Sequence, residues 1–397
     1  MLIKHFNSRE EFYKFLQKQI GISVKEAEER ASDGVFHCIY IECSGDMEPI
    51  FLSARNSCVS VFENNGKFML CGSESSIKQM CSELVKYEST KALARNILES
   101  LIKYRKSNFK LQYNGKILPL GLKTAVMGVL NVTPDSFSDG GLYFKPDAAT
   151  KRAAEMVGEG AEIVDIGGES TRPGSKRIST EEELKRVLPV LRQIRKELPN
   201  TWISIDTYKA EVARICLEEG ADIINDISGG SFDDNMLNII SEYGCPYVIN
   251  HIKGKPETWV TLPIVYDDPV AEITQWFQEK IEILKGLGYR YESNAILDPG
   301  IGFGKKPEHN VEIIKRLREF KVLGLPILLG VSRKSFVGII LREFLNMETA
   351  PVERLYGSLG AAAYAVIEGA SILRVHDVKE TRQFLAVLDA VRTFYGY

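Results

Sequence analysis

The sequence lacks any long hydrophobic run, and this bears on where the chain resides. None of its apolar stretches reaches the roughly 18 residues that a membrane-spanning helix needs. Residues 1–20 carry lysine, arginine and glutamate throughout and contain no apolar core of the kind that signal peptides have. We therefore expect no membrane partner and a cytoplasmic location.

The chain also lacks a marked excess of charge of either sign. Its 397 residues include 50 lysines and arginines against 53 aspartates and glutamates, which gives a net charge of −3. Proteins that bind nucleic acid usually show a broad basic patch that neutralises phosphates. We expect no nucleic-acid partner, and we expect any anion site to be local.

Cysteine is present but lacks the spacings of a metal site. The seven cysteines form no Cys-x-x-Cys pair, and no histidine stands near them at ligand spacing. Five of them fall within residues 1–106. We expect these to be reduced thiols that pack as small hydrophobic side chains.

What the chain does contain predicts two domains, residues 1–106 and residues 107–397. The first reads as a small α/β domain of unknown role, with helices over 10–19, 24–31, 73–86 and 90–104, a strand over 36–41 and a hairpin about Asn64-Asn65-Gly66. After a second hairpin over 109–122, apolar strands alternate with helical patterns. These strands begin near Ala125, Ile163, Trp202, Ile223, Tyr247, Asn294, Ile327 and Ile372.

The alternation of strands and helices favours an α/β fold for residues 107–397, a closed (β/α)8 TIM barrel. An open doubly wound sheet usually carries a glycine-rich dinucleotide turn after its first strand, and this chain has none there. Barrel enzymes place their reactive groups at the carboxyl ends of the strands. Polar residues at those ends are therefore the candidates for function.

The first two barrel strands end in loops rich in polar residues and glycine. Residues 127–141 read MGVLNVTPDSFSDGG and contain Asn131, Thr133, Asp135, Ser136, Phe137 and Asp139. The loop over 165–174 ends with Thr171, Arg172 and Pro173 and could close over an anion. Because the same residue types favour ordinary turns, these loops alone do not establish a site.

Later strands end in carboxylates and amides. Asp206 ends the third strand, Asn225 interrupts the fourth, and Asp298 ends the sixth. Each has a plain structural reading, as a helix cap, a satisfied buried amide and a turn residue, respectively. Together they suit a flat heterocycle, because a carboxylate accepts paired ring N–H groups.

Positively charged residues lie at or near the ends of the last two expected strands. Lys334 and Ser335 stand in a Ser-Arg-Lys-Ser stretch at an expected helix start, where a cation opposes the helix dipole. Arg374 and His376 share one face of the final strand. A solvated basic turn and a packed core histidine are the alternatives, but loops after strands seven and eight often bind phosphate in this fold.

From about residue 107 onward, the chain resembles the dihydropteroate synthase family of folate biosynthesis, through seven motifs in order. They are NVTPDSFSDGG, GGESTRPG, IDT, INDISGG, LDPGIGFGK, SRKS and RVHD. Members of this family, which sulfonamides target, join 4-aminobenzoate to dihydropterin pyrophosphate and release pyrophosphate in the presence of Mg²⁺. The resemblance implies a transferase of small molecules, a Mg²⁺ cofactor, and a homodimer formed through the barrel.

The resemblance also implies a role for each candidate residue. The pterin would contact Asp206, Asn225, Asn250, Asp298 and Lys334, and the aminobenzoate would contact Thr171, Arg172, Pro173, Phe303 and Ser335. Pyrophosphate would contact Asn131, Thr171, Arg374 and His376, with Asn131 also on the metal. The catalytic set would be Asn131, Asp206, Asp298, Lys334 and Arg374, and Thr133, Asp135, Ser136, Phe137 and Asp139 would form a closing loop.

One position departs from the family pattern, and three rival functions share parts of it. Asn250-His251-Ile252 stands where the family commonly has Met-His-Met, which puts the pterin affinity in doubt but not the reaction class.

A pterin-dependent methyltransferase would not need SFSDGG together with SRKS, and a silent paralogue would have lost loop or anion residues. A phosphate-binding isomerase does not explain Asp206, Asn225 and Asp298 together. By the same resemblance, the hairpin over 109–122 should plug the lower end of the barrel.

Overall fold

The structure is a computed structural model that describes residues 2–4, 12, 15–20, 37–42, 48–64, 67–133, 146–170, 177–255 and 263–393. The chain divides into two compact units by its contacts. One unit comprises residues 1–106 with 318–324, and the other comprises 107–317 with 325–397. None of the described helices is long and apolar enough to cross a membrane.

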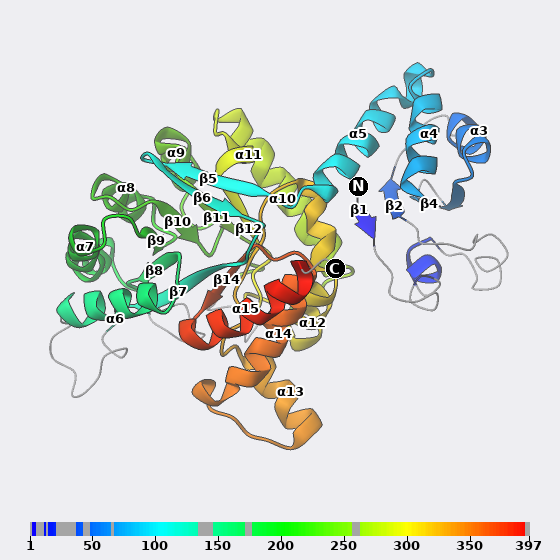
Figure 1. The fold of residues 1–397 in the computed structure, drawn as a ribbon. Coiled ribbons are helices and arrows are strands. Elements are labelled where there is room, and N and C mark those ends of the chain that lie inside the picture. Colours follow the sequence, from blue (N-terminus) through cyan, green and yellow to red (C-terminus); the bar gives the residue numbers. More distant parts are fainter. Residues whose placement is uncertain are drawn as a thin grey trace. The chain divides into compact units, whose positions relative to one another are not determined.

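An eight-stranded parallel sheet forms the centre of the larger unit (Figure 1). Its strands are β7 (Ala125–Asn131), β8 (Ile163–Gly167), β9 (Trp202–Asp206), β10 (Ile223–Asp226), β11 (Tyr247–Asn250), β12 (Ala295–Asp298), β13 (Leu328–Leu329) and β14 (Ile372–Val375). Neighbouring strands follow the order β12-β11-β10-β9-β8-β7-β14-β13, and a parallel bridge from Leu297 to Ile327 joins the two edges. The predicted closed barrel is confirmed.

Helices connect successive strands around the outside of the barrel (Figure 1). They are α6 (Pro146–Gly158), α7 (Thr180–Glu197), α8 (Ala210–Glu218), α9 (Met236–Tyr243), α10 (Pro269–Gly286), α11 (Tyr291–Asn294), α12 (Pro307–Lys315), α13 (Ser335–Leu345), α14 (Leu355–Ile367) and α15 (Val378–Thr393), with the 3-10 turn η5 (Pro351–Arg354) before α14. Helix α7 begins after its N-cap Ser179 and includes Pro189. Its buried residues Val187, Leu191 and Ile194 have the spacing of one helix face.

The interior of the barrel is apolar at the amino ends of the strands. A hairpin of β5 (Phe109–Tyr113) and β6 (Lys116–Leu120) closes this end. Its turn residues Asn114 and Gly115 both have positive φ, 46° and 75°, as a two-residue hairpin turn requires. One buried cluster contains Leu111, Leu118, Leu120, Ala125, Met127, Ile163, Trp202, Ile223, Val248, Ile296, Leu328 and Ile372, so the hairpin plugs the barrel as expected.

The smaller unit contains an antiparallel four-stranded sheet of order β1-β2-β4-β3. Its elements are β1 (Leu2–Lys4), η1 (Leu16–Ile20), β2 (His37–Glu42), α3 (Glu48–Asn56), β3 (Ser60–Asn64), β4 (Lys67–Gly72), α4 (Glu74–Leu84) and α5 (Glu88–Arg105). The expected strand, hairpin and two following helices are present, whereas β1 and α3 were not anticipated. The helix expected over 24–31 lies outside the described residues, whereas η1 covers residues 16–19 of the one expected over 10–19.

A segment from the second half of the chain belongs to the smaller unit. Residues 318–324 lie in the 3-10 helix η4 (Leu317–Leu323) and the glycine that follows it. Glu319 pairs with Lys4 at 3.1 Å, both side chains being buried, and Phe320 is fully buried. Lys106 donates a hydrogen bond to the carbonyl of Gly324 at 3.2 Å. This association was not expected from the sequence.

The described cysteines of residues 1–106 match the prediction of buried thiols with one exception. Cys38, Cys71 and Cys81 are buried, and the sulfurs of Cys38 and Cys71 lie 3.2 Å apart across β2 and β4. Cys58 is exposed, so the prediction is wrong there, and Cys43 lies outside the described residues. Within the described part of the chain, no three His, Cys, Asp or Glu side chains gather as a metal site.

Candidate active site

Polar side chains line the barrel interior at the carboxyl ends of the strands. Because alternate residues of a strand face the same side, positions two and four residues beyond the apolar cluster also point inward. Among these positions are Asp165 and Gly167 of β8, Asp206 of β9, Asn225 of β10, Asn250 of β11, Asp298 of β12 and Arg374 of β14. The strand register places Asp206 beside Gly167 and Asn225, and Asn250 beside Asp298. The strand-end candidates thus share one site.

Arg374 is the centre of a charge network inside the barrel. Its Nε donates to Oδ2 of Asp165 at 2.6 Å, and its Nη2 donates to Oδ2 of Asp206 at 2.6 Å. Asn225 Nδ2 donates to the same oxygen of Asp165 at 3.1 Å. Asp165 is fully buried, and a buried carboxylate without a cation is costly. Because Nε and Nη2 of Arg374 are bonded to carboxylates, the predicted contact between Arg374 and pyrophosphate would use its third guanidinium nitrogen, Nη1.

Asp165 is a site residue that the sequence analysis missed. Its signal was an aspartate at an inward position of an otherwise apolar strand, IVDIG. Its Oδ1 has no hydrogen-bond partner among the described residues, and neither has Oγ of Ser204, which lies opposite on β9. Buried polar atoms usually have a partner. This layer can therefore bond to a ligand or a water molecule.

Asp298 and Lys334 are two further charged groups of the site, and each shifts the pKa of the other. The N–H of Gly300 donates to Oδ1 of Asp298 at 2.8 Å, and burial raises the pKa of Asp298 against the opposing effect of Lys334. Lys334 Nζ donates to the carbonyl of Ile301 and lies 4.7 Å from the ring centroid of Phe303. Burial lowers the pKa of Lys334 to about 8. Lys334 and Phe303, predicted to contact different substrates, are thus neighbours.

Asn250 holds backbone in place around the site. Its Nδ2 donates to the carbonyl of Ile227 at 2.7 Å and more weakly to that of His251 at 3.4 Å. Lys305, another residue that the sequence analysis passed over, contacts Nδ1 of His251 at 2.9 Å and donates to the carbonyl of Phe303 at 3.0 Å. The loops are so close that a Cβ on Gly300 would lie 1.9 Å from the carbonyl oxygen of His251. The loops after β10, β11 and β12 are therefore joined.

The remaining candidates lie around the mouth of the barrel or outside the described residues. A Cβ at Gly167 would lie 3.6 Å from both Oδ1 of Asn131 and Cβ of Asp206, so Gly167 keeps open the space between them. His376 Nδ1 lies 3.1 Å from Oγ of Ser332, and Ser335 begins α13. Thr133 follows β7 and is described. The residues outside the described part are Asp135, Ser136, Phe137, Asp139, Thr171, Arg172 and Pro173.

Comparison with known proteins identifies the family of the barrel. The pterin binding enzyme family matches residues 127–376. Dihydropteroate synthase of Escherichia coli strain K12 is 47% identical over 265 residues, which cover 67% of this chain and 90% of that protein. The chain belongs to the dihydropteroate synthase family.

Solved structures of dihydropteroate synthases agree with this assignment. The Yersinia pestis enzyme in complex with a sulfonamide drug is 40% identical with a TM-score of 0.66, and the alignment covers 72% of this chain and 99% of that one. The Xanthomonas albilineans enzyme with 4-aminobenzoic acid is 37% identical with a TM-score of 0.66, covering 72% of this chain and 100% of that one. As a dihydropteroate synthase, the chain is a transferase that produces dihydropteroate. Residues 1–106 lie outside the matched range.

Proposed function

We propose that the polar end of the barrel makes dihydropteroate by separating charge. The methylene carbon of (7,8-dihydropterin-6-yl)methyl diphosphate loses its bond to the diphosphate oxygen, and the pterin ring delocalises the positive charge. The nitrogen of 4-aminobenzoate then bonds to that carbon and loses a proton. The observation that carries this proposal is that buried and half-buried groups of both charges, the carboxylates Asp165, Asp206 and Asp298 and the cations Arg374 and Lys334, converge at one end of the barrel, as a reaction that separates charge requires.

The carboxylates act on the pterin. Asp206 and Asp298 accept hydrogen bonds from ring N–H groups and stabilise the cationic ring as the diphosphate leaves. Burial raises the pKa of Asp206, and Arg374 opposes that rise; Lys334 has the same opposing effect on Asp298. The two cations therefore favour the ionised carboxylates that this step requires.

The leaving diphosphate lies on the side of β7 and β14. Asn131, Arg374 and His376 bind it, and Nη1 of Arg374 is available because it donates no hydrogen bond to another described residue. Phe303 and Ser335, with Thr171, Arg172 and Pro173, bind 4-aminobenzoate, the ligand of the Xanthomonas albilineans structure. The closing loop contains Thr133, Asp135, Ser136, Phe137 and Asp139. Its closure excludes water, which would otherwise attack the cation.

An assay of the purified chain tests the reaction. Incubation with both substrates and Mg²⁺ should yield dihydropteroate, and Asp298→Asn should lower kcat/KM at least about tenfold, because a charge-assisted bond is lost. Glu282→Gln removes an exposed carboxylate on α10 and is the matched control. A folded protein that makes no dihydropteroate, or an Asp298→Asn variant as active as the control, would refute the proposal.

We also propose that Mg²⁺ binds together with the diphosphate and contacts Asn131. The residues fit this ion, because Mg²⁺ prefers oxygen ligands and often takes few from the protein and the rest from substrate phosphates and water. The described residues hold no acidic cluster of the kind a separate cage would need, and Asn131 presents an amide oxygen beside Gly167. When bound, Mg²⁺ supplies positive charge to the leaving diphosphate.

Calorimetry tests the metal contact. Pyrophosphate should bind the native chain more tightly with Mg²⁺ than without it, and Asn131→Ala should reduce that gain several-fold. A gain that is unchanged in Asn131→Ala would contradict the role of Asn131. A native chain that shows no gain would contradict the metal itself.

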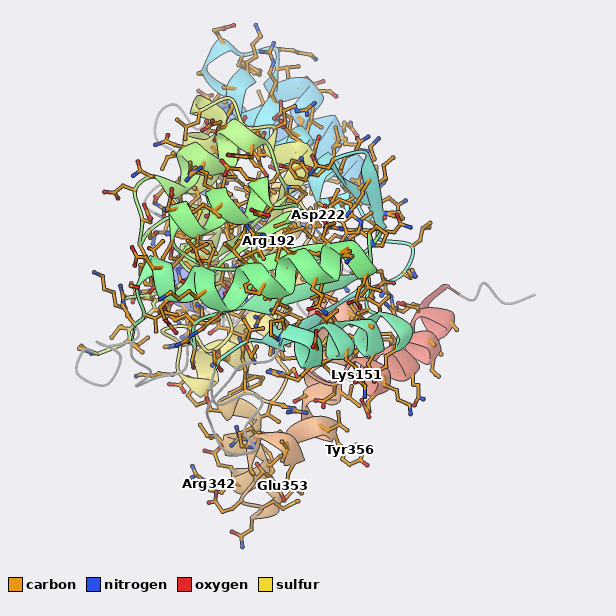
Figure 2. The ribbon with its side chains drawn as sticks, turned by 90° about the vertical axis from the view of Figure 1, so that its left-hand side faces the viewer. Lys151, Arg192, Asp222, Arg342, Glu353 and Tyr356 are labelled. Carbon is orange, nitrogen blue, oxygen red and sulfur yellow. The ribbon has the colours of Figure 1, made fainter. Side chains whose placement is uncertain are left out.

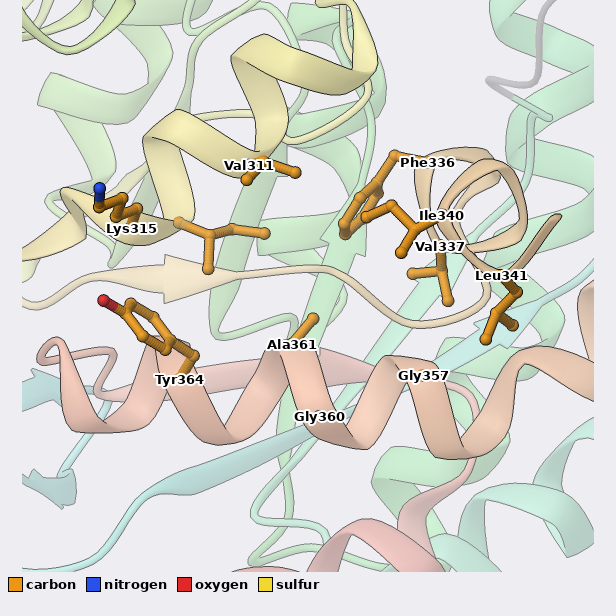
Figure 3. Close-up of a pocket in the computed structure, with 11 residues that line it drawn as sticks. Val311, Lys315, Phe336, Val337, Ile340, Leu341, Gly357, Gly360, Ala361 and Tyr364 are labelled. Carbon is orange, nitrogen blue, oxygen red and sulfur yellow. The ribbon is translucent and has the colours of Figure 1, made fainter. Parts of the chain in front are cut away.

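We propose that the chain is a homodimer whose subunits meet through α12, α13 and α14. These helices line an apolar groove of about 500 Å³, a close-up of which is Figure 3. Its lining residues are Val311, Ile314, Lys315, Phe336, Val337, Ile340, Leu341, Gly357, Gly360, Ala361 and Tyr364. It contains none of the candidate reactive groups. Phe344 and Tyr356 are 80% and 84% exposed beside it, and Tyr356, Arg342 and Glu353 lie on the same side of the unit (Figure 2). Apolar surface of this extent, rimmed by charges, is typical of a subunit interface.

A cytoplasmic location is part of the same proposal. It is supported by the free thiols among the described cysteines, since disulfides are rare in the reducing cytosol. The proposed substrates are small molecules, and their chemistry does not favour one cellular location over another.

A further inference from the structure

Arg333 has a backbone conformation that is unusual for a residue with a side chain. Its φ is +60°, in the left-handed region that favours glycine. It lies in the turn between β13 and α13, directly between Ser332 and Lys334. Residues in such conformations persist where the surrounding structure determines them, and they cluster at active sites.

The surroundings of Arg333 hold both its backbone and its side chain. Its N–H donates to Oγ of Ser358 on α14 at 3.0 Å, and its carbonyl accepts from Nη1 of Arg354 at 3.1 Å. Its guanidinium pairs with both carboxylate oxygens of Asp377, with Nε donating to Oδ2 at 3.0 Å. Asp377 follows His376 just after β14. Three separate segments thus determine this one residue.

The residues on either side of Arg333 belong to the site. Ser332 Oγ lies 3.1 Å from Nδ1 of His376 and accepts the N–H of His376 at 3.2 Å. Lys334 Nζ reaches the carbonyl of Ile301 and the ring of Phe303. A change in the turn at Arg333 would therefore move groups assigned to the pyrophosphate and to the pterin.

We infer that Arg333 is a positioning residue: its pair with Asp377 holds the strained turn that places Ser332 and Lys334, and it contacts no substrate. The inference rests on the proposed function only for the roles of Lys334 and His376. It explains why an additional cation stands at the start of α13, since Asp377 neutralises it there. A bidentate pair needs the planar fork of arginine, which lysine does not reproduce.

Steady-state kinetics of Asp377→Asn separate this role from direct binding of a substrate. If Arg333 bound the carboxylate of 4-aminobenzoate, the Asp377→Asn variant would leave that cation free, and KM for 4-aminobenzoate would stay the same or fall. If Arg333 positions the turn, the variant should lower kcat about tenfold with little change in KM, since one charge-assisted pair is lost. An unchanged kcat in folded protein would overturn the inference.

Three further variants complete the test. Arg333→Lys keeps the charge but loses the fork and should match Asp377→Asn, and the double variant should be no worse than the weaker single one, because coupled residues are not additive. Arg333→Gly relieves the φ of the turn but removes the pair, so wild-type activity in this variant would also refute the inference. Glu219→Gln removes an exposed pair with Arg192 far along the chain and serves as the matched control.

Chemical labelling of Lys334 tests the positioning role without measuring turnover, so its result does not depend on whether the proposed reaction takes place. The rate at which an amine-modifying reagent labels Lys334, measured by mass spectrometry as a function of pH, reports the surroundings of its Nζ. Asp377→Asn and Arg333→Lys should shift the midpoint of that profile, and Glu219→Gln should not. If wild-type protein makes no dihydropteroate, the proposed reaction fails, but an unshifted labelling midpoint would still overturn the positioning role.

Discussion

Lys334 is the side chain whose charge is most sensitive to its surroundings at this site. Burial lowers its pKa from 10.5 to about 8, and the carboxylate of Asp298 limits that fall. The ammonium form is therefore present below about pH 8 and is lost as the pH rises through that value. Burial also raises the pKa of Asp206 to about 7, but that carboxyl gains its charge as the pH rises, so a loss of activity on the alkaline side should report Lys334.

We therefore predict that kcat/KM falls on the alkaline side with an apparent pKa near 8, as measured in a pH–rate profile. Lys334→Arg should move the alkaline fall in kcat/KM to higher pH, because a guanidinium stays protonated there. The hydrogen bond to the carbonyl of Ile301 will change in geometry in this variant. Lys334→Ala should lower kcat/KM at least about tenfold below the limb. An alkaline limb that persists in Lys334→Arg would assign it to another group.

At the scale of elements, Asp222 joins the hairpin to the barrel wall. This residue precedes β10 and is 2% exposed in its side chain. It accepts from Lys116 Nζ of β6 at 2.9 and 3.0 Å, from Arg195 Nη2 of α7 at 2.5 Å and from the N–H of Ile203 in β9 at 2.9 Å. One carboxylate thus connects the plug with a helix and a strand.

Asp222→Ala should lower the free energy of unfolding by about 3 kcal/mol, because it leaves two partly buried cations without their partner. Chemical denaturation measures this change, and Asp234→Ala, at an exposed site, is the control. Turnover per folded molecule should change little, since Asp222 lies at the end of the barrel away from Asp298 and Arg374. Equal stability of the two variants would show that the hairpin is held by its leucines alone.

At the scale of the whole molecule, the groove over α12, α13 and α14 should determine the oligomeric state. Ala361→Arg places a long cation on the floor of the groove and should convert the dimer to a monomer in light scattering. Val391→Arg, at a 72% exposed position of α15 outside the groove, should leave the dimer intact. A dimer that survives Ala361→Arg, or a native chain that is monomeric, would refute the proposed interface.

Removal of residues 1–106 should leave the chemistry but reduce stability. Every described candidate reactive group lies between Asn131 and His376, so a chain that starts at Ser107 should keep most of its turnover. Residues 318–324 would lose their partners, because Phe320 becomes exposed and Glu319 loses Lys4. The melting temperature should fall, and the newly exposed Phe320 should reduce the solubility of the truncated chain. Adding Glu319→Gln and Phe320→Ser to the truncated chain should restore part of that solubility. A folded truncation without turnover would show that the first unit contributes to the reaction.

The amino-acid sequence by itself determined the barrel, its family and most of the strand-end candidates. The expected strand starts agree with the structure to within one residue, because short apolar runs between turn-forming residues are buried strands with few other solutions. The sequence also named Asp206, Asn225 and Asp298 as polar residues within or at the ends of strands, and strand parity put Arg374 and His376 on one face of the last strand. These are local properties, and local patterns encode them.

Only the tertiary structure decided which of these groups meet. Arg374 pairs with Asp165 across 209 residues, Arg333 pairs with Asp377 across 44, and Glu319 pairs with Lys4 across 315. None of these partners is near in sequence, and Asp165 looked like one more residue of a turn-bounded strand. Barrel closure and strand register bring the partners together, and the cost of burying an unpaired charge then selects those that balance each other.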